Sequence, residues 1–578
     1  MAIKTWTGAT SINWNVASNW SPASTPIATD DLVFNNAVNT NVNALYTVNS
    51  IDFSGYTGTF SGTNAITIAG STTGTSTGIS LRLSSGMTIT HSGIVTFTSL
   101  LGGYIYSNGK SLVSALVFNS ATGVWSNQDA LTSSASITLT AGTFTAGASI
   151  TTAGTFLLTA GTLNLGSYTH NINVFSSSNT GIRTLDFGTS TLNITGSGTT
   201  VWNTGTVTSL TILGTSPIVN FTYSGSTGSR VISFGALSEA NSITANISAG
   251  SDAITLSGAS FKSLNFTGYS GACPLGNNTI YKDLTLSATQ TIATSGTLTF
   301  AGTSVTQTIT SNGITIPTAT LTINSATTTV QNSGALTTTG VLTLTTGTLN
   351  INANLTIGAT SAFTFTAGTI TANNGANITC SSFAGGSGTG VRVLNMGSGT
   401  WTLTGTGGWA SGVATNYTLN AGQSRIVFTD TSATTINFTS GGTYTYYTVE
   451  YARGGGGGRL DFTSSTNTTI VNFIDNTSTA VHIIGFQSGQ WNFYKFNVRG
   501  RAGALIQVSR TGTTSPTIAK VGQGIVPYCD FLNIVSTGFT ATPANTWYAG
   551  ANSTGSGGGW VMTAAPSSQS LLGGGGVG

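Results

Sequence analysis

Short runs in which an aliphatic residue alternates with Thr, Ser or Asn recur along nearly the whole chain. Alternation with a period of two is typical of a β-strand that is buried on one face. Gly, Ser or Asn bounds each run, as expected for turns between short strands. The pattern therefore predicts an all-β fold built from many short strands. Clear examples are the five-residue runs 65–69, 136–140, 155–159, 320–324 and 350–354.

The composition excludes the main alternatives to a β fold. Charged residues make up 5% of the chain, against about 25% in an ordinary soluble domain. With two Glu and six Lys in 578 residues, the chain lacks the charged outer faces that long amphipathic helices need. Disorder is also disfavoured, because 39% of the residues are hydrophobic and the mean hydropathy is +0.20.

A longer motif, Thr-Gly-x-Arg followed by a strand and a Trp, is repeated along the chain. The segment 180–188 with Trp202 matches the segment 389–397 with Trp409, and Ala-Gly-Thr turns precede both copies. A third trace covers 227–235, and shorter ones begin at Arg425 and Arg459. Self-similarity of strands and turns is the sequence signature of a solenoid.

These repeats predict an elongated parallel β-helix, or β-solenoid, over residues 41–440. Stacked coils pair the backbone of each strand with the coils on either side. Aliphatic residues would point inward and Thr outward, while Gly and Asn would supply left-handed positions at the corners. We expect about 20–25 residues in each coil, with about 4.8 Å between coils. A string of antiparallel β-sandwiches is the alternative that the pattern leaves open.

The first 40 residues carry a cluster of three indoles, Trp6, Trp14 and Trp20. A solenoid exposes an apolar cross-section at its first coil, which must be covered. Residues 1–40 are therefore interpreted as an N-terminal segment that either caps the solenoid or docks it onto another subunit.

The composition changes near residue 441, and we predict a distinct aromatic-rich C-terminal β domain over 441–562, followed by a flexible Gly-rich tail over 563–578. Residues 445–530 hold 11 of the 29 charges of the chain. Aromatic rings and arginines dominate binding hot spots, which makes four residues candidate binding residues: Trp491, Tyr494, Arg499 and Arg501. The alternative is that Trp491, Trp547 and Trp560 form the core of a C-terminal cap.

The sequence contains no readable catalytic or metal-binding constellation, and we expect a non-enzymatic protein without cofactor or metal. The segment 74–78 fits a Gly-x-Ser-x-Gly pattern, but the helix that a nucleophile elbow requires does not follow it. His91, His170 and His482 have no carboxylate or second histidine beside them in the sequence.

Cysteines and carboxylates are also widely spaced. Cys273, Cys380 and Cys529 form no Cys-x-x-Cys pair, so we interpret them as buried thiols. Paired carboxylates on a β-helix face can cleave glycosides, but the 13 acidic residues are scattered. An isolated Asp in such a chain is typically a turn residue.

Charge and hydropathy also limit the partners. The 16 basic residues form no stripe, so we expect no nucleic-acid binding. The longest apolar runs, such as 112–118, are too short to span a membrane, and we expect no membrane insertion. The first residues do not match a signal peptide, which predicts synthesis in the cytoplasm of a host cell. So few charges predict a homo-oligomer, with a trimer as the expected form.

The segments 528–534, 547–553 and 557–560 together resemble the closing segment of structural proteins of tailed bacteriophages, especially marine ones. The Thr-Gly-x-Arg repeats are similar to repeats in the same group. This resemblance implies a virion component, such as a tail fibre, spike or appendage, that contacts other virion proteins and a glycan or protein on the host surface. It would be located in the extracellular virion particle.

Two other functions stay open at this point. The opening with Trp6, Trp14 and Trp20 resembles the entry segment of secreted β-helical adhesins, which implies a bacterial surface adhesin or filament subunit. The other alternative is a tailspike that depolymerises polysaccharide.

Overall fold

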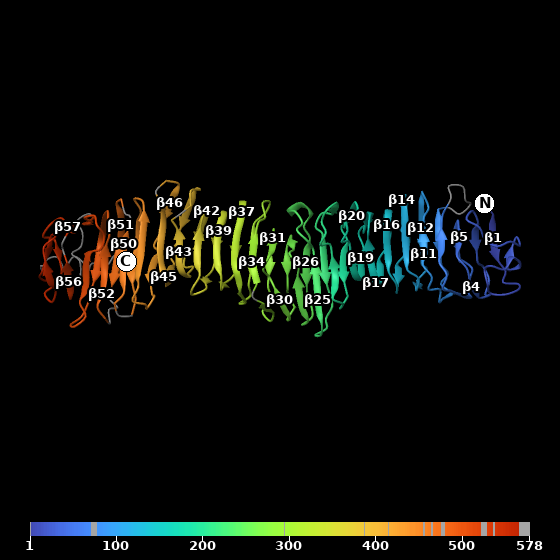
Figure 1. The fold of residues 1–578 in the computed structure, drawn as a ribbon, viewed down its shortest axis with the longest axis horizontal. Helices are drawn as coiled ribbons and strands as arrows, with labels where there is room; N and C mark the ends of the chain where they lie inside the picture. Colours follow the sequence, from blue (N-terminus) through green and yellow to red (C-terminus); the bar gives the residue numbers. More distant parts are fainter. Residues whose placement is uncertain are drawn as a thin grey trace. The chain divides into compact units, whose positions relative to one another are not determined.

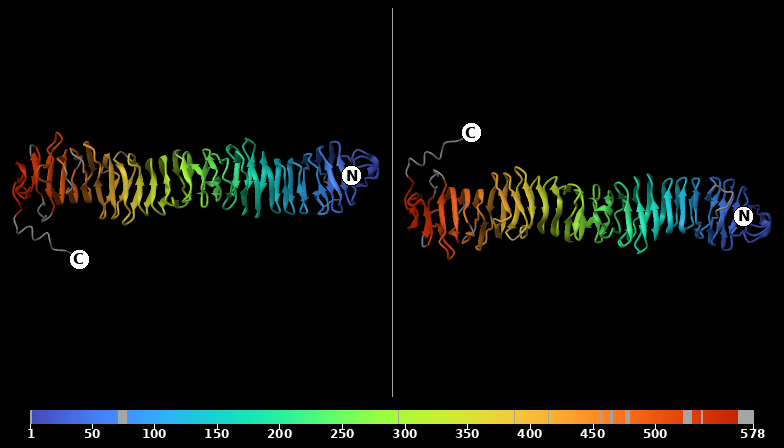
Figure 2. Two further views of the ribbon diagram at one scale, coloured as in Figure 1. Left: turned by 90° about the horizontal axis from the view of Figure 1, so that it is seen from below. Right: turned by 90° about the horizontal axis from the view of Figure 1, so that it is seen from above.

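The computed structural model describes residues 2–70, 78–293, 295–386, 388–413, 415–454, 457–463, 466–475, 480–521, 529–535 and 538–565. The chain divides into two compact units. Unit 1 comprises residues 1–274 and 289–291, and unit 2 comprises residues 275–288 and 292–578. Each unit is an all-β parallel solenoid, as the sequence predicts. In Figures 1 and 2 the strands of each unit are stacked coil upon coil.

Unit 1 begins with β1 (Ile3–Trp6), and its described helical segments are the short 3-10 turns η1 (Ala17–Asn19) and η2 (Glu239–Asn241). Its other strands of four or more residues are β7 (Thr59–Gly62), β9 (Ile79–Arg82), β12 (Gly102–Tyr106), β14 (Leu116–Asn127), β16 (Ile137–Ala146), β17 (Ile150–Leu158), β18 (Gly161–Asn164), β19 (Thr169–Ser176), β20 (Arg183–Asp186), β21 (Thr191–Ile194), β22 (Thr200–Asn203), β23 (Leu210–Leu213), β24 (Ile218–Phe221), β25 (Ser229–Ser233), β26 (Thr244–Ile247) and β27 (Ala253–Leu256).

Unit 2 has the same organisation. Its strands of four or more residues are β34 (Ser295–Phe300), β35 (Gln307–Thr310), β37 (Thr318–Asn332), β39 (Val341–Ile351), β41 (Ala362–Phe365), β42 (Gly368–Ala372), β43 (Ile378–Gly385), β44 (Arg392–Asn395), β45 (Thr400–Val413), β46 (Tyr417–Asn420), β47 (Arg425–Phe428), β48 (Thr435–Gly441), β49 (Thr445–Tyr451), β50 (Arg459–Thr463), β51 (Thr468–Asp475), β52 (His482–Phe486), β53 (Gln490–Val498), β54 (Ile506–Arg510), β55 (Thr517–Lys520) and β56 (Leu532–Val535).

Parallel pairing between successive coils decides between the two predicted architectures. Ile137 in β16 pairs with Leu116 of the preceding coil and with Phe156 of the following coil. Phe175 in β19 pairs with Trp202. All three pairs are parallel, so the alternative of antiparallel sandwiches is wrong. The coil from Phe175 to Trp202 is longer than the coil from Ile137 to Phe156, and this variation explains why the repeat could not be counted from the sequence.

The interior of each unit is apolar, and its aromatic rings stack from coil to coil. In unit 1, the Phe175 and Trp202 rings stack with centroids 4.6 Å apart, and Trp202 stacks in turn on Phe234 at 5.2 Å. In unit 2, Phe383 stacks on Trp409 at 4.4 Å. Because paired strands are in register, identical inward positions lie above one another, and each ring buries the next.

Polar residues occupy the outward positions and also pair between coils. Asn193 donates a hydrogen bond to Asn171 at 3.0 Å, Asn220 donates to Asn193 at 3.0 Å, and Asn246 donates to Asn220 at 2.9 Å. The two middle amides, Asn193 and Asn220, therefore both donate and accept along the stack, and the ladder ties four coils of unit 1 together without charge.

The repeated sequence motif forms equivalent corners in the two units. Gly161 pairs with Arg183 in unit 1, and Gly368 pairs with Arg392 in unit 2. Both glycines have positive φ, +89° and +99°, and a Cβ there would clash with a carbonyl of the preceding coil. The Ala-Gly-Thr turn is thus explained by close packing of backbones at a left-handed position.

The three N-terminal indoles are packed inside unit 1. Trp6, Trp14 and Trp20 are each at most 2% exposed. Trp20 lies edge-on to Trp6 at 5.0 Å and to Trp14 at 5.5 Å, and Phe34 stacks on Trp14 at 5.6 Å. The three indoles therefore belong to the packed interior, and both the capping and the docking role of residues 1–40 stay predictions.

The aromatic-rich C-terminal region is present in unit 2. Its strands belong to the same parallel stack as those before residue 441, because β48 pairs with β50 and β47 pairs with β49. Trp547 and Trp560 are at most 6% exposed, with ring centroids 5.3 Å apart. The predicted boundary near 440 therefore marks a change in composition within a continuous ladder. Of the predicted tail, residues 566–578 lie outside the described residues.

Candidate functional site

Charged side chains gather at one corner of the coils of unit 2. Strands β47, β49, β51 and β53 end there in register, with Phe428 paired to Tyr451 and Asp475 paired to Val498. Strands β48, β50, β52 and β54 leave the corner, also in register. We call the described loop residues between these strands (429–434, 452–454, 457–458, 480–481 and 499–505) the charged corner.

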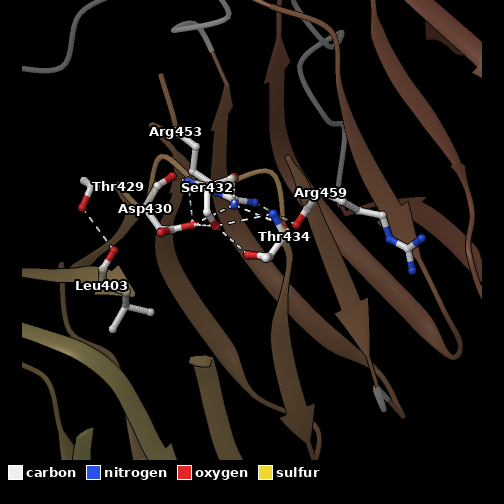
Figure 3. Close-up of polar contacts among 7 residues, drawn as sticks. All are labelled: Leu403, Thr429, Asp430, Ser432, Thr434, Arg453 and Arg459. Atoms are coloured by element: carbon white, nitrogen blue, oxygen red, sulfur yellow. Dashed lines mark hydrogen bonds and ion pairs between the residues drawn. The ribbon is translucent and has the colours of Figure 1, made fainter. Parts of the chain in front are cut away.

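Arg453 lies at the centre of this corner (Figure 3) and is 2% exposed. Its guanidinium donates to the Asp430 carboxylate at 2.8 Å and to the Asp430 carbonyl at 2.9 Å. It also donates to the carbonyls of Ser432 at 2.6 Å, Thr434 at 3.0 Å and Arg459 at 3.0 Å. Because these partners belong to two successive loops, Arg453 fixes one loop against the next.

Two further ion pairs lie on neighbouring strands. Arg459 forms a two-pronged pair with the fully buried Asp461, with Nε 2.6 Å from Oδ1. Arg425 pairs with Glu450 on the adjacent coil. The high charge density of this part of the sequence is therefore used largely within the scaffold.

A buried histidine–aspartate pair lies on the next coil. His482 Nε2 is 2.6 Å from Asp475 Oδ2, and His482 Nδ1 is 3.1 Å from the carbonyl oxygen of Ala480. A carbonyl only accepts, so Nδ1 carries a proton. The imidazole stacks on Tyr451 with centroids 4.3 Å apart.

Burial raises the pKa of the Asp475 carboxyl, and the hydrogen bond and charge of His482 oppose that rise. Asp475 Oδ1 has no hydrogen-bond partner among the described residues. The sequence could not identify this pair, because the two residues come from consecutive strands, β51 and β52, that meet across a corner.

Beside the charged corner the surface of unit 2 is hollowed into a depression with a volume of about 580 Å³. Its lining combines aliphatic groups, one aromatic ring and three amides. The lining residues are Val481, Ala502, Gly503, Leu505, Gln507, Phe531, Asn533 and Asn552.

The backbone of Phe531 adopts a left-handed conformation with φ of +54°. Its N–H donates to Asp530 Oδ1 at 3.0 Å, and its carbonyl accepts from Ile506 N–H at 3.1 Å. Gly500 lies against that carbonyl, where a Cβ would be 2.5 Å from the Phe531 oxygen. A bulky residue in this region is a genuine outlier that costs about 1–3 kcal/mol, and such outliers concentrate at functional sites.

The four predicted binding residues are not brought together as one surface. Trp491 is fully buried, with its ring 5.0 Å from Phe462. Tyr494 is 43% exposed on the outer face of β53. Arg499 and Arg501 are exposed, and the turn from Arg501 to Ala504 carries two lining residues of the depression. A binding role for these four residues stays a prediction, and the depression itself was missed.

The other two histidines and the three cysteines are largely buried in the scaffold. His91 and His170 are fully buried and hydrogen-bonded to backbone carbonyls, and burial lowers the pKa of both. Cys273 and Cys380 are buried thiols, as predicted, whereas Cys529 is partly exposed. In the described part of the chain, no group of three or more His, Cys, Asp or Glu side chains could hold a metal ion. Residues 74–77 of the Gly-x-Ser-x-Gly match lie outside the described residues.

Comparison with known proteins gives no relative. No protein-family model, no curated protein and no solved structure matches this chain. Within the described residues, no helix is long and apolar enough to cross a membrane.

Proposed function

We propose that this chain is a non-enzymatic structural protein of a virion, a tail fibre, spike or appendage that takes part in attachment to a host surface. The parallel solenoid is compatible with a fibre, spike or adhesin-like structural role. The resemblance of the segments 528–534, 547–553 and 557–560 to structural proteins of tailed phages supports the virion assignment.

The observation that carries the proposal is that the acidic side chains are bonded to groups of the scaffold. In the described part of the chain, twelve acidic side chains are seen to accept hydrogen bonds or form ion pairs with neighbouring backbone or side-chain groups of the solenoid itself. These twelve are Asp30, Asp31, Asp52, Asp129, Asp186, Asp252, Asp283, Asp430, Glu450, Asp461, Asp475 and Asp530. Carboxylates held in this way favour a scaffold over a pair of catalytic acids.

The proposal includes self-association, for which unit 1 offers a candidate surface. Leu100, Leu101 and Val124 are 69%, 64% and 53% exposed and adjoin one another, since Val124 N–H donates to the Leu101 carbonyl. Clustered exposed aliphatic residues are typical of interfaces. We expect a second copy of the chain to cover them in a homo-oligomer, for which a trimer is the expected form.

Sedimentation of the purified chain at micromolar concentration tests self-association. An oligomer is expected, and Leu100→Ser with Leu101→Ser should shift it toward the 58.4 kDa monomer. A wild-type chain that sediments as a monomer would contradict this part of the proposal.

Immunogold electron microscopy tests the virion assignment. Antibodies raised against the purified chain should label appendages of phage particles prepared from the source of the sequence. Labelling of uninfected cells would instead support a surface adhesin or filament subunit. Shortening of bacterial polysaccharide by the purified chain would support a depolymerising tailspike.

A further inference from the structure

The depression in unit 2 has a lining whose polar groups are arranged along the stack of coils. Gln507 in β54 pairs with Asn533 in β56, so the two amides lie on successive coils in the same column. Asn552 precedes the next coil, in which Thr554 pairs with Asn533. The distance between strands, about 4.8 Å, therefore sets the spacing of Gln507 and Asn533 in this column, and Asn552 lies two residues before the Thr554 position.

These amides keep hydrogen-bonding capacity for a ligand. Gln507 Nε2 donates to Ser509 Oγ at 3.1 Å, and Asn552 Nδ2 donates to Asp530 Oδ2 at 2.9 Å. Each bond uses the NH₂ group of the amide and leaves the amide oxygen as an acceptor. The Asn533 oxygen accepts from Thr554 at 3.5 Å, which leaves its NH₂ group as a donor. The column thus offers both acceptors and a donor, all neutral.

Phe531, the aromatic residue of the lining, has a strained backbone conformation. Phe531 is half-buried, lines the depression and occupies a left-handed backbone position that Gly or Asn would adopt more easily. The strain is maintained by its hydrogen bonds to Asp530 and Ile506 and by the close approach of Gly500. The backbone of Phe531 is therefore held in place where the residue lines the depression together with Val481 and Leu505.

The backbone around the depression is already paired, which restricts the ligand. Strand β54 pairs with β52 and β56, and β56 pairs with β54 and with β59 (Thr554–Ser556). An extended peptide consequently has no free strand edge here to which it could add. Recognition has to use the ring, the aliphatic groups and the amides.

We propose that this depression is a saccharide-binding site. A sugar ring has an apolar C–H face, which packs on an aromatic ring, and hydroxyl groups, which both donate to and accept from amides. The column of amides at the spacing of the coils suits a chain of several sugar units better than a single sugar. This inference rests on the proposed function and names the class of surface molecule that the attachment protein contacts.

The test uses the purified full chain and a printed array of oligosaccharides from bacterial capsules and lipopolysaccharide O-chains, followed by calorimetric titration of the best-bound oligosaccharide. Phe531→Gly removes the ring and also relieves the backbone strain, so this variant should fold at least as well as the wild type. Asn533→Ala removes the central amide. We expect each change to weaken binding by about tenfold or more.

Two matched variants serve as controls. Tyr447→Ala removes a 40% exposed ring of unit 2 that does not line the depression, and Asn420→Ala removes an exposed outward amide of unit 2 that is bonded to Asn395. Both should change the affinity by less than about twofold.

The inference is overturned if no oligosaccharide binds, or if binding survives Phe531→Gly and Asn533→Ala. It is equally overturned if Tyr494→Ala abolishes binding while Phe531→Gly does not, which would place the site on the outer face of β53. Particles that the antibody labels but whose appendage protein binds no oligosaccharide would overturn the saccharide site alone. Oligosaccharide binding that follows the expected variants, without labelling of particles, would overturn the virion assignment alone.

Discussion

Two corners of the molecule, one in each unit, are held by a buried arginine in different ways. In unit 1, Arg183 is fully buried and donates to four backbone carbonyls, those of Ser177, Gly181, Thr206 and Thr208. Burial lowers the pKa of this guanidinium. In unit 2, Arg453 also donates to carbonyls of neighbouring loops, but one of its partners is the Asp430 carboxylate.

The difference shows what a buried arginine contributes to a corner. A guanidinium has five N–H donors in a fixed fork, and the carbonyls of two loops can satisfy most of them without any counter-ion. Arg183, the arginine of the first Thr-Gly-x-Arg copy, is therefore a clamp between successive corners. A carboxylate is an optional addition to that clamp, and the cost of losing the carboxylate should depend on how many carbonyls remain.

Arg230 of unit 1 represents the extreme case and should give the largest effect. Its Nε and Nη2 donate to Asp252 at 2.6 and 2.9 Å, both residues are fully buried, and Nη1 has no partner among the described residues. Asp252→Ala leaves the charge unpaired and should reduce the free energy of unfolding by about 3–5 kcal/mol, measured by chemical denaturation.

The control is the double variant Arg230→Met with Asp252→Leu, which replaces both charged side chains by apolar ones. It should recover most of the lost stability. A single variant as stable as the wild type would contradict the view that the carboxylate is the essential partner of this arginine.

The apolar interior of unit 2 gives a comparably large effect. Trp491→Ala removes a fully buried indole that packs on Phe438 and Phe462 and should cost about 3–5 kcal/mol. Tyr494→Ala, on the same strand but 43% exposed, should change stability by about 0.5 kcal/mol or less. Thermal melting of both variants measures this contrast, and equal losses would mean that the ring of Tyr494 is packed against something in the assembly.

Asp430→Asn should have a smaller effect and tests the comparison directly. Asn can still accept a hydrogen bond from Arg453 but lacks the carboxylate charge, so the loss should stay below the value of about 1.5–3 kcal/mol for a hydrogen bond between charged groups. Arg453 also keeps its carbonyl partners Ser432, Thr434 and Arg459. Denaturation should therefore show a loss below that of Asp252→Ala. If the two losses are equal, the carbonyls do not support the charge and the Arg183 corner needs another explanation.

The sequence predicted the solenoid because its signal is repeated in almost every coil. Alternation places residues such as Leu394 inside, where the structure finds this side chain fully buried. Neither the hydrogen bonds of the motif arginines nor the His482–Asp475 pair could be predicted from the sequence. Both depend on which loops meet at a corner. The sequence does not define the pairing of the loops because the coils differ in length, as the pairs Ile137–Phe156 and Phe175–Trp202 illustrate.

The binding residues were harder still to predict from composition. Exposed rings and charges were expected to mark a binding surface, but Trp491 is core and most nearby charges are paired within the scaffold. Phe531 gave no signal, since its distinguishing feature is a backbone angle. The lining amides Gln507 and Asn533 resemble many other outward polar residues, and only the pairing of β54 with β56 places them together.

The smallest predicted effect is a dependence of stability on pH. It should occur at the corner with a buried carboxyl, Asp475, and not at the corner of Arg183. Burial raises the pKa of Asp475 in the folded chain, despite the opposing hydrogen bond from His482, so the folded state holds this proton more tightly than the unfolded state. Stability from this group is therefore present at low pH. It is lost as pH rises from about 4, the ordinary value for Asp, through the raised pKa.

Asp475→Asn isolates this contribution, because Asn does not titrate and can still donate to His482. The stability of the wild type relative to the variant should be greatest below about pH 4 and should decline as pH rises, as measured by denaturation across a pH series. Arg183→Met in unit 1 is the matched corner variant without a carboxylate, and its stability difference from the wild type should not vary over the same range. A wild-type advantage over Asp475→Asn that grows with pH would mean that the pair is an ion pair with a depressed carboxyl pKa.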